Sequence, residues 1–212
     1  MTGGIGAGKS TVGAGLVERG AVLIDADQIV RDLQQPGRPV FDAIVKRWGP
    51  VVVAADGTLD RAAVAAVVFK DSGELDALNA IVHPAVGAEM VERRAAAAEQ
   101  SPGSVVVLDI PLLVRPGGRP IAERYRGLSG IVVVDADPET AVQRLVAQRG
   151  FSEEDARARI ASQAGRESRL EAADFVISND GAPEELAPQI DACYRWAASL
   201  SGCGGYPVLD HD

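Results

Sequence analysis

The sequence predicts an α/β fold in which a parallel sheet lies between two layers of helices. Four short apolar runs alternate with longer segments of helical pattern, and they span residues 21–24, 104–108, 130–134 and 174–178. Nearly continuous, β-branched hydrophobicity is typical of strands that helices cover on both faces. Hydrophobic residues make up 47% of the chain but aromatic residues only 4%. We therefore expect a core built mainly from Val, Leu, Ile and Ala.

Composition excludes several classes of function. The chain of 212 residues has 21 basic and 30 acidic side chains, a net charge of −9, which argues against a general nucleic-acid binder but allows a local cationic pocket for a small anion. Cys193 and Cys203 cannot form a disulfide framework, so a reducing cytoplasm is expected. No apolar run approaches the ~20 residues of a membrane helix, and no signal peptide is seen.

The first element is a glycine-rich loop. Residues 3–10 match G-x-x-x-x-G-K-[ST] in full, and a helical pattern follows over 11–19. Such a loop points backbone N–H groups at phosphate oxygens, and the helix dipole adds to that attraction. Lys9 would reach the β- and γ-phosphates, and Ser10 would ligate Mg²⁺. A plain glycine turn before a helix is the disfavoured alternative. The predicted nucleotide-binding residues here are Gly4, Ile5, Gly6, Ala7, Gly8, Lys9, Ser10 and Thr11.

The strand that should precede this loop is hard to find. Only Met1 and Thr2 stand before Gly3. We therefore expect the first strand to be missing, and we favour a chain whose start is read late over a domain that lacks the strand. An in-frame stop codon directly upstream of Met1 would exclude a late start.

Carboxylates follow the ends of the predicted strands, where ligands of open α/β sheets bind. Asp27 comes just after the first apolar run. It could orient or deprotonate a substrate hydroxyl, or it could cap the helix that begins there. Asp109 could hold Mg²⁺ through a water or be an ordinary loop acid. Asp135 and Asp137 favour structural roles, since Asp137 before Pro138 is typical of a helix start.

Residues 39–99 predict a helical insertion between two strands. The only strand-like run is 51–53, and breaks are expected at Gly49-Pro50, Asp56-Gly57 and His83-Pro84. A terminal helix is expected from Pro183 to about residue 200, and the Gly-rich segment 201–212 is expected to be poorly ordered. The predicted core then comprises 1–38, 100–147 and 174–200.

Residues 148–173 predict a small helical lid. One helix should end near Arg149 at Gly150, and Ser152 should cap the next. A closing lid would keep water from the transferring group. Arginine forks match phosphoryl oxygens. Six arginines fall between residues 144 and 169, five of them in the predicted lid: Arg144, Arg149, Arg157, Arg159, Arg166 and Arg169.

Two of these arginines favour a plainer interpretation. Arg157 and Arg159 stand four residues after Glu153 and Asp155, a spacing typical of ion pairs on a solvated helix face. Arg149, at a helix end, is better placed to bind an anion.

The sequence does not match other common site motifs. No G-x-G-x-x-G dinucleotide-binding motif fits the loop, and two histidines cannot make a His-rich metal site.

Taken in their order along the chain, the motifs of this sequence resemble those of the dephospho-CoA kinase family. The phosphate loop alone is shared by many families, but the ordered set is specific and runs from residue 2 to about 200. The matching segments are 2–12, 24–27 with Arg31, 55–59, 83–84, 111–113, 163–169, 173–174 and 179–181.

The resemblance implies a P-loop kinase fold and the last step of coenzyme A synthesis. ATP would phosphorylate the ribose 3′-hydroxyl of dephospho-CoA to give CoA and ADP. By analogy Asp27 would orient or deprotonate that hydroxyl, while Lys9 and Ser10 would hold the phosphates and Mg²⁺. Arg149, with Arg144 and Arg166, would stabilise the transferring charge from the lid.

The resemblance also places the rest of the site. Asn179 and Gly181 would lie near the adenine, and the insertion would bind the acceptor, with Arg31, His83 and Leu113 as candidates. His83 could equally be a turn residue before Pro84. Besides the first strand, two features depart from the family: Val114-Arg115 stands where a Glu is usual, and the tail around Cys203 has no counterpart and no expected catalytic role.

Other functions remain open. The chain could be a nucleotide-binding switch without acceptor chemistry, or a nucleoside or nucleotide kinase, although the length of 39–99 favours a larger acceptor. The expected partners are a small-molecule substrate, dephospho-CoA, with ATP and Mg²⁺, and neither nucleic acid nor membrane. A monomer or a weak homo-oligomer is expected.

Overall fold

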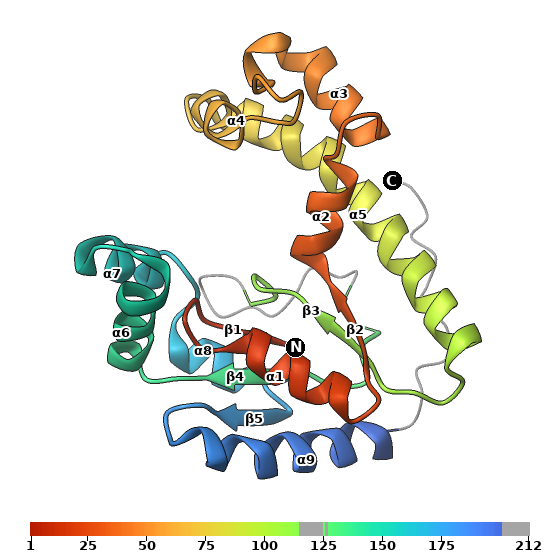
Figure 1. Ribbon diagram of the computed structural model, residues 1–212, viewed down its shortest axis with the longest axis vertical. Coiled ribbons are helices and arrows are strands. Elements are labelled where there is room, and N and C mark those ends of the chain that lie inside the picture. Colours follow the sequence, from red (N-terminus) through yellow and green to blue (C-terminus); the bar gives the residue numbers. More distant parts are fainter. Residues whose placement is uncertain (115–124, 126, 201–212) are drawn as a thin grey trace. The chain divides into compact units, whose positions relative to one another are not determined.

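The computed structural model describes residues 1–114, 125 and 127–200, and the chain divides into two compact units (Figure 1). The first unit is Met1–Leu23 with Ser101–Asp212, and the second is Ile24–Gln100. The second unit thus begins before the insertion expected at 39. Two features noted in the sequence, Arg115 near the position where the family usually has Glu and the tail 201–212, lie outside the described residues.

A parallel sheet forms the centre of the first unit. Strand order is β1-β4-β5, with Thr2 beside Val133 and Asp135 beside Ser178. A second sheet pairs β2 with β3. The strands are β1 (Thr2–Gly3), β2 (Val22–Asp25), β3 (Val106–Asp109), β4 (Val132–Asp135) and β5 (Phe175–Ser178). The four apolar runs of the sequence therefore form strands, each within two residues of the expected start.

The first strand is present, which corrects the expectation that it would be missing. Thr2 and Gly3 pair with β4, and Thr2 is fully buried. Met1 joins the two sheets, because its amino group donates to the Leu108 carbonyl at 2.6 Å and its carbonyl accepts from Ile110 N at 3.0 Å. That pattern is typical of parallel strands. The carboxyl ends of β3, β1, β4 and β5 consequently meet at one edge.

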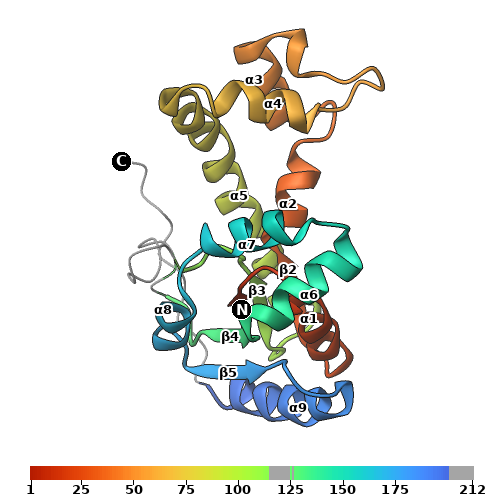
Figure 2. The ribbon, with the colours of Figure 1, turned by 90° about the vertical axis from the view of Figure 1, so that its left-hand side faces the viewer.

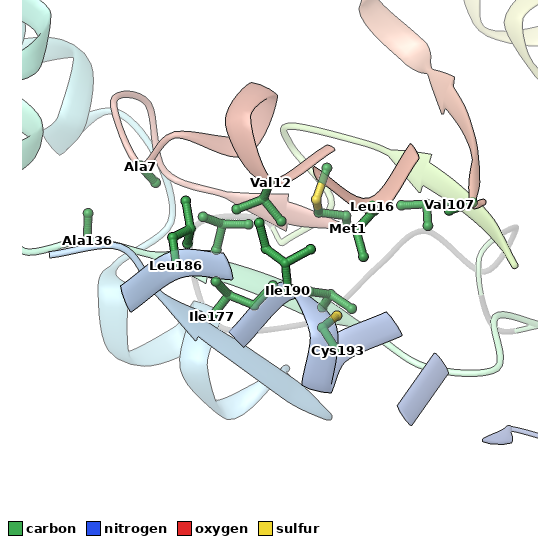
Figure 3. Packing of buried hydrophobic residues seen from close by; sticks show 13 residues of the cluster. Met1, Ala7, Val12, Leu16, Val107, Ala136, Ile177, Leu186, Ile190 and Cys193 are labelled. Carbon is green, nitrogen blue, oxygen red and sulfur yellow. The ribbon is translucent and has the colours of Figure 1, made fainter. Parts of the chain in front are cut away.

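Helices pack against this sheet. α9 contacts both α1 and β5, and α8 contacts β4 (Figure 2). The core between α1, α9 and the strands is aliphatic, as expected, and includes Val12, Leu16, Ile177 and Ile190 (Figure 3). The helices of this unit are α1 (Lys9–Glu18), α6 (Pro138–Arg149), α7 (Glu153–Ala161), α8 (Arg166–Glu171) and α9 (Pro183–Ser199).

Local capping signals were predicted well in the lid segment and in the helix before it. Asp137 caps α6 by accepting from Glu139 N at 2.9 Å, and Gly150 ends that helix with φ of 67°. Ser152 caps α7 by accepting from Asp155 N at 3.0 Å. The segment expected to be a lid therefore contains α7 and α8, joined by a short turn.

The second unit is helical around a small aliphatic core of Val40, Ile44, Val52 and Val82. Its elements are α2 (Ala26–Leu33), α3 (Pro39–Trp48), the 3₁₀ turn η1 (Pro50–Val52), α4 (Arg61–Val68) and α5 (Ser72–Gln100). Because α2, α3 and α4 each contact α5, this long helix organises the unit. No helix in the part of the chain described is long and apolar enough to span a bilayer.

One strand-like run in this unit has another structure, and one expected break was wrong. The run 51–53 is not a strand but a 3₁₀ turn that ends in a single bridge from Val53 to Leu59. The break expected at His83-Pro84 does not occur, because Pro84 lies inside α5. His83 is therefore an exposed helical residue and not a turn residue. The breaks at Gly49-Pro50 and Asp56-Gly57 are confirmed by the ends of α3 and by a turn closed by Asp56.

Candidate active site

The glycine-rich loop connects β1 to α1 at the carboxyl edge of the sheet. Ala7 N donates to Gly4 O at 3.1 Å and closes the loop, while Gly6 and Gly8 have φ of 80° and 88°. Gly8 is the N-cap of α1 and no side chain caps the helix. The first backbone N–H groups of α1 therefore point out of the helix end, an arrangement that binds phosphate. Lys9 is the first residue of α1, and its Nζ donates to Gly3 O at 3.4 Å.

Two side-chain amides hold this loop from outside. Asn179, which follows β5, donates from Nδ2 to the Ala7 carbonyl at 2.8 Å. Gln163, between α7 and α8, accepts from Ile5 N at 2.8 Å. The Ile5 side chain also packs against a cluster of α6 and α7 residues that includes Leu145. The loop is thus tied both to the end of a strand and to the expected lid.

Two arginines bring unsatisfied donors to the same place. Arg169 lies against Gly4, where a Cβ would be 3.0 Å from Nη2. Burial lowers the pKa of Arg169, and its Nε has no hydrogen-bond partner among the described residues. Arg144 donates from Nη2 to Asn179 O at 2.7 Å, while its buried Nη1 likewise has no partner within the described ranges. Buried donors left unpaired are costly, so they suit an incoming anion.

Arg166 is instead occupied by a protein carboxylate. Its Nη2 lies 2.7 Å from a carboxylate oxygen of Asp135, which is only 4% exposed, and its Nη1 lies 4.0 Å from Asp137. The hydrogen bonds that Arg166 donates to the Asp135 carboxylate raise the pKa of Arg166. The structural role expected for Asp135 therefore includes holding the Arg166 side chain.

The remaining lid arginines are spread over the surface. Arg149 ends α6 and is exposed. Arg157 pairs with Glu153 at 2.8 Å, as expected, and with Glu139 at 2.6 Å. Arg159 lies over the Phe151 ring at 4.7 Å, and the ion pair expected with Asp155 is not formed in the described part of the chain.

Three further candidates belong to the first unit. Asp109 ends β3 and is half-buried, at the same sheet edge as the loop. Gly181 lies just beyond Asn179 and is exposed. Leu113 is only 2% exposed, so its side chain offers almost no surface to a ligand.

The acceptor candidates of the second unit lie on α2 and α5. Asp25, not Asp27, caps α2, since it accepts from Gln28 N at 3.0 Å. The capping interpretation of Asp27 is therefore wrong. Asp27 is exposed in the first turn of α2, and within Ile24–Gln100 its carboxylate has no hydrogen-bond partner. Arg31 is steadied by Gln28 at 3.0 Å and by Asp25 at 3.6 Å.

The site offers few protein ligands for Mg²⁺, as expected for a metal ion that enters bound to the nucleotide. In the described part of the chain no group of three or more His, Cys, Asp or Glu side chains could hold a metal. The exposed Ser10 hydroxyl at the start of α1 and the half-buried Asp109 carboxylate at the end of β3 are oxygen groups of the kind that would ligate Mg²⁺. Mg²⁺ takes few protein ligands when water and substrate phosphates complete its shell, so this sparse pair fits.

Sequence reasoning missed Gln163 and Arg169 as site residues. Both belong to the segment 163–169 that carried the family resemblance, but only Arg166 was assigned a role there. Gln163 lies between α7 and α8, and Arg169 lies within α8. What the sequence could not give is the partner of each side chain, since Gln163 and Ile5 are 158 positions apart.

A parallel sheet whose first strand leads through a phosphate loop into a helix, with arginines above that loop, defines a P-loop kinase. The sequence profile of one such family, dephospho-CoA kinase, matches residues 1–185. The chain belongs to the dephospho-CoA kinase family.

Relatives agree over nearly the whole chain. The dephospho-CoA kinase of Streptomyces avermitilis is 50% identical over 190 residues, which cover 90% of this chain and 88% of the relative. That of Thermobifida fusca is 45% identical and covers 90% of each. The crystal structure of TT1252 from Thermus thermophilus has a TM-score of 0.74 at 34% identity over 95% of this chain and 96% of that one. The fold class and the resemblance given by the sequence are confirmed.

Proposed function

We propose that the protein transfers the γ-phosphoryl group of ATP to the ribose 3′-hydroxyl of dephospho-CoA, giving CoA and ADP. Family membership supports the reaction, and one structural observation carries it. The loop between β1 and α1 presents unpaired N–H groups at a helix start, with the buried donors of Arg144 and Arg169 nearby. Such convergence of donors stabilises charge on a transferring phosphoryl group.

The donor side of the reaction is assigned to the first unit. Lys9 and the loop amides would bind the β- and γ-phosphates, and Thr11 lies in the first turn of α1 behind them. Ser10, with Asp109 through water, would hold Mg²⁺, which neutralises phosphate charge when bound. Arg149 would reach the transferring group from the lid, whereas Arg144 would act from beside the loop. Asn179 and Gly181 remain candidates for contact with the adenine.

The acceptor side is assigned to α2 and α5. The 3′-oxygen attacks the γ-phosphorus, the bond to the β,γ-bridging oxygen breaks, and the hydroxyl proton passes to Asp27. Support comes from the exposure of this carboxylate and from the capping of α2 by Asp25 instead. Arg31, which is half-buried, and His83, which is exposed, remain the candidates for contact with the acceptor. Leu113 is too buried to offer such a contact.

A coupled assay of ADP release tests the function. Purified protein with ATP and Mg²⁺ should release ADP rapidly only when dephospho-CoA is added, and not with adenosine. Slow hydrolysis that no acceptor accelerates would indicate a nucleotide switch instead. Removal of Mg²⁺ by a chelator should abolish turnover, and turnover that persists would refute the magnesium assignment. Gel filtration checks the expected monomer or weak homo-oligomer.

Asp27→Asn tests the proposed base. The substitution should lower kcat by about 10²–10⁴-fold with little change in ATP affinity, because a general base acts in the chemical step. Asp42→Asn is the matched control, since Asp42 is likewise exposed in the first turn of its helix, α3. Full turnover in Asp27→Asn would remove Asp27 from this role.

The proposed setting is the cytoplasm. Cys193 is a free thiol buried in the core against α1 and β5 residues, and unpaired cysteines are typical of reducing compartments. Fractionation of the source cells checks this assignment.

A further inference from the structure

We propose that Asn179 and Gln163 are positioning residues that set the orientation of peptide planes in the phosphate loop, and thereby its affinity for a triphosphate whatever base is attached. The proposal rests on the proposed function only in that the loop binds the phosphates of ATP. It gives Asn179 a role other than contact with adenine, and it gives Gln163 its first role.

Asn179 fixes the peptide between Ala7 and Gly8. A trans peptide is planar, so its C=O and N–H groups point in opposite directions. Asn179 Nδ2 donates to the Ala7 carbonyl at 2.8 Å and holds that oxygen toward the end of β5. The Gly8 N–H is consequently directed away from Asn179, to the other side of the peptide plane. Without Asn179, the buried Ala7 would leave its carbonyl unpaired, and the plane could rotate.

Gln163 fixes the peptide between Gly4 and Ile5 in the opposite sense. The Gly4 carbonyl accepts from Ala7 N at 3.1 Å within the loop, and the Ile5 N–H points outward to Gln163 Oε1 at 2.8 Å. One amide thus accepts from the loop and the other donates to it. The partner groups dictate which end of each amide faces the loop, since a backbone N–H requires an oxygen and a carbonyl requires an N–H.

Both amides are themselves anchored. Asn179 N donates to Asp135 O at 2.8 Å, and Arg144 donates to Asn179 O at 2.7 Å, so its backbone is held by two neighbours. The Asn179 side chain occupies the space where a Cβ of Gly8 would lie, 2.2 Å from Nδ2. Gln163 is carried by the turn between α7 and α8, next to Ala164, which is 3% exposed. Rigid supports of this kind preserve the loop geometry when no phosphate is bound.

The experiment is calorimetric titration of the full chain with MgATP and, separately, with inorganic tripolyphosphate and Mg²⁺. The variants are Asn179→Leu and Gln163→Met, which keep side-chain size and remove the hydrogen bond. Each should weaken both ligands about tenfold, the usual effect of one lost hydrogen bond, and the two factors should multiply in the double variant if the peptides act independently.

Gln189→Met is the matched control. Gln189 also binds backbone with its amide, accepting from Ser178 N and donating to Ser178 O, both at 2.9 Å, but it does not touch the phosphate loop. This variant should bind both ligands as the unaltered chain does. Equal weakening in Gln189→Met would show that a disturbed β5 end, and not the loop contacts, lowers affinity, and would overturn the proposal.

The remaining outcomes separate the alternatives. Weakening of MgATP alone in Asn179→Leu would indicate that Asn179 reads the adenine, and would overturn its positioning role. Unchanged affinity for both ligands would overturn the proposal entirely. Amide hydrogen exchange of Ile5 in the unaltered chain needs no variant: protection is expected, and exchange as fast as in an open loop would refute the bond to Gln163. If the unaltered chain binds neither ligand, the proposed function fails instead.

Discussion

Gly8→Ala should destabilise the fold through two separable effects. Gly8 has φ of 88°, and a left-handed backbone costs a residue with a side chain about 1 kcal/mol. The new Cβ would lie 2.2 Å from Asn179 Nδ2, so the Asn179 amide must move and its bond to the buried Ala7 carbonyl breaks. That loss adds about 1–2 kcal/mol, for a total of about 2–3 kcal/mol.

Gly150→Ala isolates the backbone effect. Gly150 has φ of 67° and nothing within 4 Å of the added Cβ, so about 1 kcal/mol is expected. The free energy of unfolding is measured by urea denaturation of both variants, and of Gly8→Ala combined with Asn179→Ala. In that background Gly8→Ala should cost only about 1 kcal/mol. Two results would refute the reasoning. One is that Gly8→Ala in the unaltered chain costs no more than Gly150→Ala. The other is that Gly8→Ala costs as much in the Asn179→Ala background as in the unaltered chain.

Two further predictions concern ion pairs in the two units. Asp135→Asn should lower the free energy of unfolding by about 1–3 kcal/mol, because the nearly buried carboxylate holds Arg166 with hydrogen bonds down to 2.7 Å; an unchanged denaturation midpoint would contradict this. The hydrogen bond from Arg47 lowers the pKa of Glu74 below its ordinary value of 4.5. A lowered carboxyl pKa stabilises the fold above that value and loses its effect as pH falls through the folded-state pKa. Denaturation midpoints of Glu74→Gln and the unaltered chain should therefore differ at pH 7 and converge in acid, and a constant difference would oppose the assignment.

Much of the fold could be predicted because its signals are local. The β-branched runs locate the strands, and Asp137, Gly150 and Ser152 mark helix ends through contacts within a few residues. Short apolar runs are ambiguous, and at 51–53 Pro50 favoured a 3₁₀ turn over a strand. Pro84 also misled, because packing of α2, α3 and α4 along α5 outweighs the hydrogen bond that an internal proline removes.

The cap of α2 shows how a small shift changes a functional argument. Asp25 and Asp27 both follow an apolar run, and either could begin a helix. β2 extends through Asp25, whose backbone is extended and whose carboxylate reaches Gln28 N. Asp27 falls inside the first turn, where no cap is needed. Because Asp25 caps α2, capping no longer explains the presence of Asp27. This supports the proposal that Asp27 is the base.

The site was harder to predict because its supports come from distant parts of the chain. The loop motif predicts glycines for their backbone freedom, yet two of them also make room for side chains. Gly8 accommodates Asn179, 171 positions later, and Gly4 accommodates the half-buried Arg169. A single sequence contains no signal that pairs such positions. The loop sequence therefore satisfies two constraints. It must bind phosphate, and its glycines must leave room for the Asn179 and Arg169 side chains that pack against them. Only the first constraint is visible in the motif. Substitutions that respect the motif can still fail if they ignore these outer neighbours.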